Sequence, residues 1–301
     1  MKLIHSIVAA SLMGIAALAP ALVVAYDFSR PQDSVDAFVR MRGNTDGTDS
    51  IADWHVTVFI VEPGKRAMPI MRLDGFNVGR AIKQADGSYQ WLSREVAYYR
   101  DLKTGQIMDK WENPLTGKTN DILHVINDPV NGKFAPATFN VPWRVKGDDV
   151  FLTTDVPLAY PNALQPADFP EESTGPTYFA SEHFLFFAKM ADFDNPKLTS
   201  VPSTYAWTRT GPWLPWMKLG QRPGYVLYSG QGKKLKSAAD LDPVVREVTE
   251  KNHPHFMKAP TTLATPNETS WSYYKKMRGG GKGAAVSTPS ASATPPDLTK
   301  K

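Results

Sequence analysis

Residues 91–131 read WLSREVAYYRDLKTGQIMDKWENPLTGKTNDILHVINDPVN and contain the same kind of turn twice, as DLKTG at 101–105 and NPLTG at 113–117. In each turn an Asp or Asn that can hydrogen-bond the turn's own backbone precedes a Gly that can adopt a positive φ. This is the chemistry of a short β-hairpin loop. We therefore predict an antiparallel meander rather than helices, built from the flanking runs 89–100, 106–112 and 118–127.

Strand alternation along residues 89–100 sorts the side chains onto two faces. One face carries Trp91, Ser93, Glu95, Ala97 and Tyr99, and the other carries Leu92, Arg94, Val96, Tyr98 and Arg100. Each face mixes aromatic or apolar side chains with charged ones. We expect one face to meet a core and the other to line a polar cavity or a covered surface. Solvated charges paired across strands are the alternative.

The first 25 residues have the pattern of a secretory signal peptide. Lys2 precedes an apolar run at 7–18, and small residues at 23–25 suit cleavage before Tyr26. We therefore expect a periplasmic or secreted protein. No later apolar run has the length that a membrane-spanning helix needs, so we expect no membrane span after the signal is removed.

Residues 279–301 are rich in Gly, Ser, Thr, Ala and Pro and are predicted to form a disordered tail, which leaves 26–278 as a single β-rich domain. The chain has a formal charge of +4. Lys2 and a surplus of five basic residues at 275–301 account for six positive charges, so residues 26–274 carry −2. This balance argues against a nucleic-acid partner. The absence of cysteine excludes disulfides, thiol nucleophiles and cysteine-held metals.

The remaining chain predicts mainly β structure. A helix is expected from Pro31 to Gly43 with Asp33 as N-cap, and another from Asp242 to about His253. Strands are expected at 55–61, 68–73, 76–83, 138–145, 150–156, 178–189 and 225–229, with a break at residues 74–75 and an aromatic-rich loop at 205–224. This pattern indicates an antiparallel β-barrel or sandwich, a lipocalin-like meander with a few short helices. Nucleotide-binding and hydrolase motifs are absent, so we expect no organic cofactor.

Five motifs in order resemble the family known as domain of unknown function 1838. They are WLSREVAYYRDLKTG at 91–105, WENPLTG at 111–117, HVINDPV at 124–130, WTRTGPWLPW at 207–216 and NETSW at 267–271. The resemblance covers about residues 30–278. It implies one domain, in a family whose members are often exported, and it implies no general activity or cofactor.

Among the histidines, His124 is the candidate general base, with Asp128 or Glu112 as the carboxylate that sets its tautomer. His183 follows Glu182, but adjacent strand residues face opposite ways, so these two cannot cooperate directly. Spacing does not show that histidines and carboxylates converge on a metal, and we expect none.

Several residues are candidates for substrate binding. Arg94, Arg209 and Arg222 have the planar donors that clamp a carboxylate or phenolate, although each could instead pair with Glu95, Glu112 or Glu182 inside the fold. Trp207, Trp213 and Trp216 predict either a small-molecule pocket or a cover over the open end of the sheet. The expected substrate-binding set is Arg94, Tyr98, Trp111, His183, Arg209, Trp213 and Trp216.

Two functions fit this pattern. The first is a cofactor-independent lyase, isomerase or hydrolase that acts on a small aromatic or apolar molecule by acid/base catalysis. The second is a periplasmic carrier or sensor that holds such a ligand in a lipocalin-like barrel. Because a carrier needs few buried charges and the meander is rich in them, the sequence favours the enzyme.

Overall fold

The computed structural model describes residues 26–278, so the predicted signal peptide at 1–25 and the predicted tail at 279–301 lie outside the described part. The strands are β1 Ser50–Val61, β2 Met68–Lys83, β3 Tyr89–Arg100, β4 Lys110–Glu112, β5 Thr119–Asp121, β6 Val125–Asn127, β7 Gly132–Phe134, β8 Trp143–Lys146, β9 Asp149–Pro161, β10 Thr177–Lys189, β11 Thr204–Gly211 and β12 Tyr225–Leu235. The helices are α1 Pro31–Arg42, α2 Met190–Phe193, α3 Pro243–Asn252 and α4 Ser270–Arg278, with 3-10 turns η1 Pro215–Met217, η2 Ala238–Asp240 and η3 Pro254–Met257.

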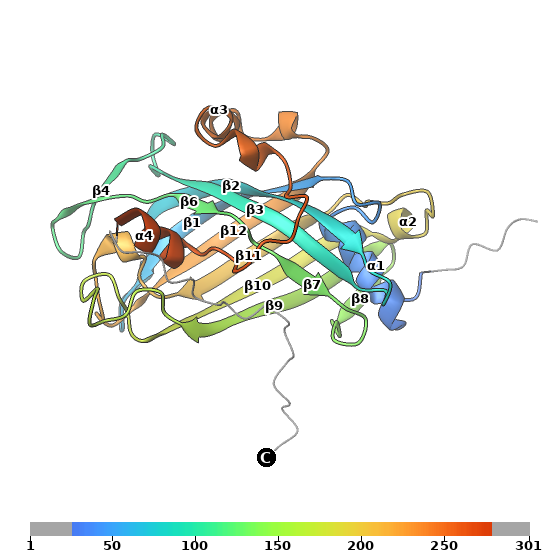
Figure 1. The fold of residues 1–301 in the computed structure, drawn as a ribbon, viewed down its shortest axis with the longest axis horizontal. Helices are drawn as coiled ribbons and strands as arrows, with labels where there is room; N and C mark the ends of the chain where they lie inside the picture. Colours follow the sequence, from blue (N-terminus) through green and yellow to red (C-terminus); the bar gives the residue numbers. More distant parts are fainter. Residues whose placement is uncertain (1–25, 279–301) are drawn as a thin grey trace, which may run out of the picture.

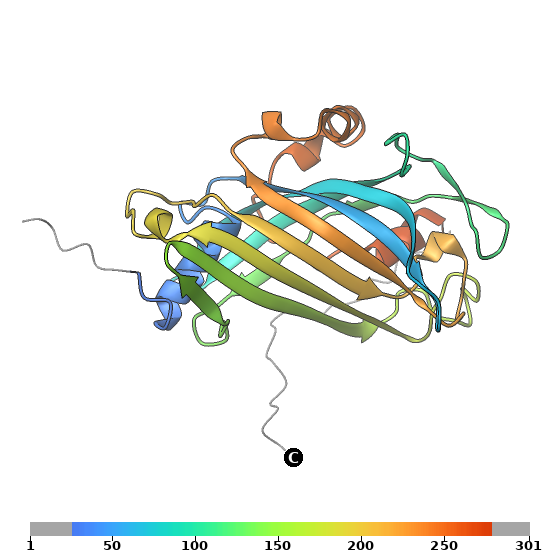
Figure 2. The same ribbon diagram turned by 180° about the vertical axis from the view of Figure 1, so that it is seen from behind.

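Ten strands form one curved antiparallel sheet in the order β6-β3-β2-β1-β12-β11-β10-β9-β8, with β7 also paired to β3 (Figure 1). Seen from behind, the long strands cross the molecule side by side (Figure 2). This confirms the predicted antiparallel, mainly β class. The sheet does not close into a barrel, because the edge formed by β3, β6 and β7 does not pair with the edge formed by β8 and β9.

The two predicted turns form as the sequence indicates. Gly105 and Gly117 have φ values of 68° and 69°. The side chains of Asp101 and Asn113 each accept a hydrogen bond from the backbone two residues later, at 2.9 Å in both turns. The meander is nevertheless divided, because β4 and β5 pair only with each other and β6 alone returns to β3.

The predicted break at residues 74–75 is wrong, because β2 runs through it. A Cβ on Gly75 would lie 2.3 Å from the Cβ of Ala97, so only glycine lets β3 pack here. The fully buried carboxylate of Asp74 accepts bonds from Arg72 at 2.7 Å and Arg100 at 2.9 Å. These tertiary contacts outweigh the local turn preference of an Asp-Gly pair.

His55 completes this group on the outer side of the sheet. Its Nδ1 lies 3.2 Å from Asp74 and its Nε2 lies 3.4 Å from Asp53, whose side chain is also buried. Hydrogen bonds to Asp53 and then to Asp74 raise the pKa of His55 to about 9. The group therefore connects β1, β2 and β3 through charges that are paired inside the protein.

Two further sequence expectations need correction. The expected loop at 205–224 is strand up to Gly211, so Trp207 stands on β11 and only the part that includes η1 is a loop. Asp33 does not cap α1, which begins at Pro31 after Arg30. The other helix cap is confirmed, since the Asp242 side chain accepts hydrogen bonds from the first backbone N–H groups of α3.

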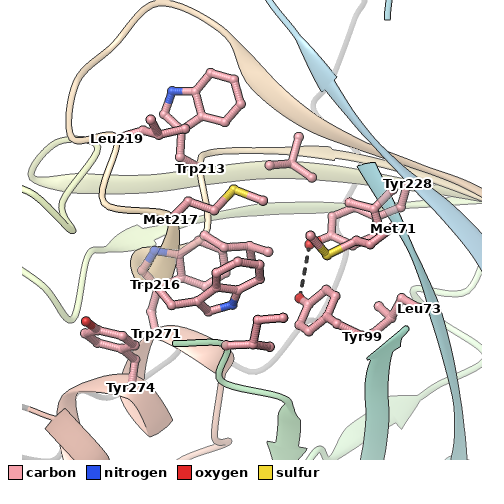
Figure 3. Close-up of a cluster of buried hydrophobic side chains, with 14 of the residues drawn as sticks. Met71, Leu73, Tyr99, Trp213, Trp216, Met217, Leu219, Tyr228, Trp271 and Tyr274 are labelled. Atoms are coloured by element: carbon pink, nitrogen blue, oxygen red, sulfur yellow. Dashed lines mark hydrogen bonds between the residues drawn. The ribbon is translucent and has the colours of Figure 1, made fainter. Parts of the chain in front are cut away.

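Other elements close the ends of the curved sheet and cover its outside (Figure 1). At one end, Phe38 and Met41 of α1 pack in a cluster with Phe186 of β10. At the other end, Trp213 and Trp216 pack with residues of β2, β12 and α4, including Met71, Tyr228 and Trp271 (Figure 3). α3 and η3 pack on the outer face. Packed side chains thus cover both ends of the inner face.

Replacing Asp74 by Asn should destabilise the fold, because the substitution removes the buried carboxylate that Arg72, Arg100 and His55 share. The buried Arg100 then keeps only Asp242, at 3.2 Å. Loss of one partner from a buried ion pair costs about 3–5 kcal/mol. Urea unfolding monitored by tryptophan fluorescence measures the change. Asp149→Asn is the matched control, because its pair with Lys189 is exposed on both sides. Equal stability losses in the two variants would contradict this role for Asp74.

Candidate functional site

The inner face of the sheet encloses a cavity of about 480 Å³, which joins a narrower recess of about 90 Å³. The two spaces adjoin, because the same side chains line both: Arg42, Glu95, Asn127, Glu182, Phe184, Arg209 and Ser270. The larger volume lies within the range of about 300–1,000 Å³ that is typical of small-molecule sites. We refer to the two together as the cavity.

Aromatic rings form the wall of the narrow recess. Trp207 of β11 lies 5.8 Å from Tyr228 and 6.2 Å from Phe184, measured between ring centroids. The ring of Trp54 on β1 lies 6.5 Å from that of Trp207. These rings offer flat apolar surfaces at the spacing at which aromatic pairs attract one another. The recess therefore suits a flat, apolar ring of a ligand.

Two carboxyl groups face this cavity from distant strands. Glu95 is on β3 and Glu182 is on β10, and β2, β1, β12 and β11 lie between these strands in the sheet. Burial and then the negative charge of Glu182 raise the pKa of Glu95, while a hydrogen bond from Asn127 opposes the rise. The amide of Asn127 donates to Glu95 Oε2 at 3.4 Å. The site therefore favours the protonated form of Glu95.

Glu182 is held by a cation and an indole. Arg209 Nε lies 3.5 Å from Glu182 Oε1, and Trp207 Nε1 donates to Glu182 Oε2 at 3.3 Å. Arg209 also donates to the Tyr178 hydroxyl and lies 5.5 Å from the centre of the Tyr228 ring. Arg209 was predicted to bind substrate or to pair inside the fold. It lines the cavity and pairs with Glu182.

Several polar atoms of the cavity wall make no hydrogen bond within the described residues, although one of them, Arg209 Nε, takes part in the ion pair with Glu182. Within residues 26–278, the buried side-chain atoms without a hydrogen bond include four from residues that line the cavity: Trp54 Nε1, Asn127 Oδ1, Arg209 Nε and Trp271 Nε1. Buried polar atoms in native proteins are nearly always hydrogen-bonded to protein or to ordered water, so these atoms are available to water or to the polar groups of a ligand.

His124, the predicted general base, does not line the cavity. Its Nδ1 accepts a hydrogen bond from the backbone N–H of Tyr99 at 3.2 Å. Burial lowers its pKa to about 4, so the imidazole is neutral at pH 7. No hydrogen bond or ion pair within the described chain joins it to Asp128 or Glu112. A catalytic role for His124 stays a prediction, and the geometry does not bring its expected partners to it.

The predicted polar partners are spread over the outside of the sheet. Asp128 accepts from Arg94 at 2.8 Å, and Arg94 also binds backbone carbonyls of the segment at η3. The Tyr98 hydroxyl lies 3.1 Å from that of Thr249 on α3. Glu112 and His183 are exposed on β4 and β10. The last finding agrees with the prediction that Glu182 and His183 face opposite ways.

The predicted tryptophans belong to the sealed end of the sheet. Trp111 and Trp216 meet edge to face at 5.7 Å. Trp213 is 1% exposed and donates to the backbone carbonyl of Arg222 at 2.7 Å. The sequence predicted that these rings either line a small-molecule pocket or cover the end of the sheet. Trp213 and Trp216 cover the end of the sheet. Trp207 alone of the three from that segment lines the cavity.

Sequence reasoning missed Glu95 and Arg42 as site residues. Alternation along β3 had already placed Glu95 on the face of Trp91 and Tyr99, and these three residues do line the cavity. That face could have identified Glu95. Arg42 gave no comparable signal, because a basic residue in the last turn of a helix is ordinary.

The described part of the chain contains neither a metal-site cluster nor a membrane-spanning helix. Among residues 26–278, no cluster of three or more His, Asp or Glu side chains has the arrangement of a metal site. Within the same residues, no helix has the length and apolar character needed to cross a membrane.

Replacing Glu95 by Gln should remove a pH-dependent destabilisation of the fold. The folded-state pKa of Glu95 lies above its ordinary value of 4.5, so the carboxyl favours folding below pH 4.5 and this contribution is lost as pH rises through the folded pKa. The variant should therefore gain stability relative to the wild type as pH increases from 4 to 8. Thermal unfolding across that range measures the gain, and a pH-independent difference would contradict the assignment.

Comparisons with known proteins give a family and little more. None of the curated proteins matches this chain. Among solved structures, the chain is similar to Ail, the attachment invasion locus protein of Yersinia pestis, with 11% sequence identity over 63% of this chain and 99% of Ail. The TM-score of that match is 0.17, which is too low to indicate a shared fold. The family model described as "Protein of unknown function (DUF1838)" matches residues 47–278, and the chain belongs to this family.

Proposed function

We propose that this chain is an exported enzyme that moves protons on a small aromatic or apolar molecule without an organic cofactor. The reaction is that of a lyase, isomerase or hydrolase, with Glu95 as general acid and base. One observation carries the proposal. Glu95 and Glu182 face one cavity from strands that lie far apart in the curved sheet, and the charge of Glu182 raises the pKa of Glu95.

A carboxyl with a raised pKa suits proton transfer near neutral pH. General acid/base catalysis works best when the group's pKa lies near the working pH, and burial beside a second carboxylate is a common way to bring it there. In its protonated form Glu95 would donate its proton to the leaving atom of the substrate. In its ionised form it would accept a proton from a carbon of the substrate. Asn127 orients Glu95, and the Glu182–Arg209 pair supplies fixed charges beside the reacting atoms.

The carrier function uses the same cavity but does not account for its charges. An apolar ligand could be held by the ring wall alone, and burying carboxyl and guanidinium groups costs folding free energy. Ionisable groups with perturbed pKa values that line a cleft are concentrated at functional sites. Glu95, Glu182 and Arg209 all lie beside the rings that would hold the ligand. This arrangement supports the enzyme over the carrier.

The test begins with a panel of small aromatic compounds titrated against the purified protein. Binding near Trp54 and Trp207 should quench tryptophan fluorescence, and mass spectrometry then detects conversion of the compounds that bind. Glu95→Gln should lower the turnover rate by about 10²–10⁴-fold, the usual share of general acid/base catalysis. Its dissociation constant for the substrate should change little, because Gln keeps the size of the side chain.

Glu250→Gln is the matched control, because Glu250 is exposed on α3, away from the cavity. His124→Ala and Glu112→Gln test the sequence prediction in the same assay. Wild-type turnover by a folded Glu95→Gln variant would show that the proposed acid is wrong. Ligands that bind tightly and leave unchanged from the wild-type protein would identify a carrier instead.

A further inference from the structure

Arg42 places a guanidinium group in the cavity that no side chain within residues 26–278 pairs with. It is the last residue of α1 and lines both parts of the cavity. Its guanidinium carbon lies 5.5 Å from the centre of the Trp91 ring. Within residues 26–278, this guanidinium makes no hydrogen bond and no ion pair. Arginine carries five N–H donors in a fixed plane, so a partly buried guanidinium without an acceptor leaves strong binding capacity unused.

The other cations that line the cavity differ from Arg42. Arg209 lies 3.5 Å from Glu182, and Lys133 lies 3.3 Å from Asp86. Among the described cavity-lining residues, Arg42 is therefore the one cation without a carboxylate partner. The sequence had pointed to Arg94 and Arg222 as anion clamps, and the structure pairs these with Asp128 and Glu62 respectively.

Glu95 does not serve as the partner of Arg42. The positive charge of Arg42 is near enough to lower the pKa of Glu95, yet burial and Glu182 have the larger effect in the other direction. Glu95 instead contacts the amide of Asn127. The cavity thus contains a carboxyl whose pKa is raised and, close to it, a cation that no carboxylate within residues 26–278 pairs with.

We propose that Arg42 binds the carboxylate of the ligand, so that the substrate is a small aromatic carboxylic acid with its ring beside Trp207. This inference rests on the proposed function for the identity of the reacting site, but it makes its own claim about recognition. The planar fork of arginine matches a carboxylate with two parallel hydrogen bonds. A dianionic phosphate fits less well, because the carboxylate of Glu182 lines the same space and would repel its second charge.

The experiment compares acids with neutral amides of the same shape, such as benzoate with benzamide and cinnamate with cinnamamide. Isothermal titration calorimetry at pH 7 gives the dissociation constants. A hydrogen-bonded charge pair contributes about a ten- to hundredfold preference, so wild-type protein should favour each acid over its amide by that factor. Phenyl phosphate serves as the dianionic competitor and should bind more weakly than benzoate.

Arg42→Gln should abolish the preference for acids while amide binding stays within about threefold, and Arg42→Lys should keep part of the preference because it keeps the charge. Arg66→Gln controls for net charge, because Arg66 is exposed on the surface. Thermal unfolding verifies that each variant is folded. The Arg42→Lys variant and the wild-type comparison keep the test decisive if Arg42→Gln unfolds.

Equal binding of acids and amides by the wild type would overturn the inference, and so would an unchanged preference in folded Arg42→Gln. Tighter binding of phenyl phosphate than of benzoate would overturn the assignment to a monoanion. Glu95→Gln separates the two proposals. It should keep the preference for acids and lose turnover, so full turnover in that variant refutes the catalytic role of Glu95 and leaves recognition by Arg42 standing.

Discussion

The curvature of the ten-stranded sheet is the constraint on which the rest of the structure depends. Glu95 and Glu182 are separated by four intervening strands, and in a flat sheet their side chains would not share a cavity. Glycine makes room for large rings on the inner face. A Cβ on Gly79 would lie 2.2 Å from the Trp91 ring, and one on Gly232 would lie 2.4 Å from the Tyr205 ring. Each ring can therefore lie flat over a neighbouring strand and leave the middle of the cavity open.

Burying ionisable groups around the open cavity costs folding free energy, and contacts elsewhere in the fold offset that cost. Glu95, Glu182 and Arg209 contribute buried charge where a solid core would have apolar side chains. Apolar packing is instead concentrated at the two ends and under α3, while on the outer side Asp74 holds β1, β2 and β3 together. Because the stabilising groups lie outside and at the ends, the inner face is free to carry charges that a core would not tolerate.

Local pattern predicted much of this fold and little of the site. The paired turns, the cap at Asp242 and the two faces of β3 follow from residues near one another in sequence, and the structure confirms them. The predicted break at residues 74–75 was wrong because Gly75 is needed inside the strand, where it packs against Ala97 of the neighbouring strand β3. The grouping of Glu95 with Glu182 around one cavity could not be predicted for a similar reason. Which carboxyl meets Glu95 depends on how strongly the sheet curves, and no spacing in the sequence encodes that.

A ligand anion at Arg42 would also change the acid beside it. The charge of Arg42 lowers the pKa of Glu95, so a carboxylate that offsets this charge removes part of the opposing influence and raises that pKa further. Binding of the substrate would then be coupled to proton uptake by Glu95. Recognition and catalysis would then be linked electrostatically, because the group that selects an acid as ligand also contributes to how firmly the neighbouring carboxyl keeps its proton.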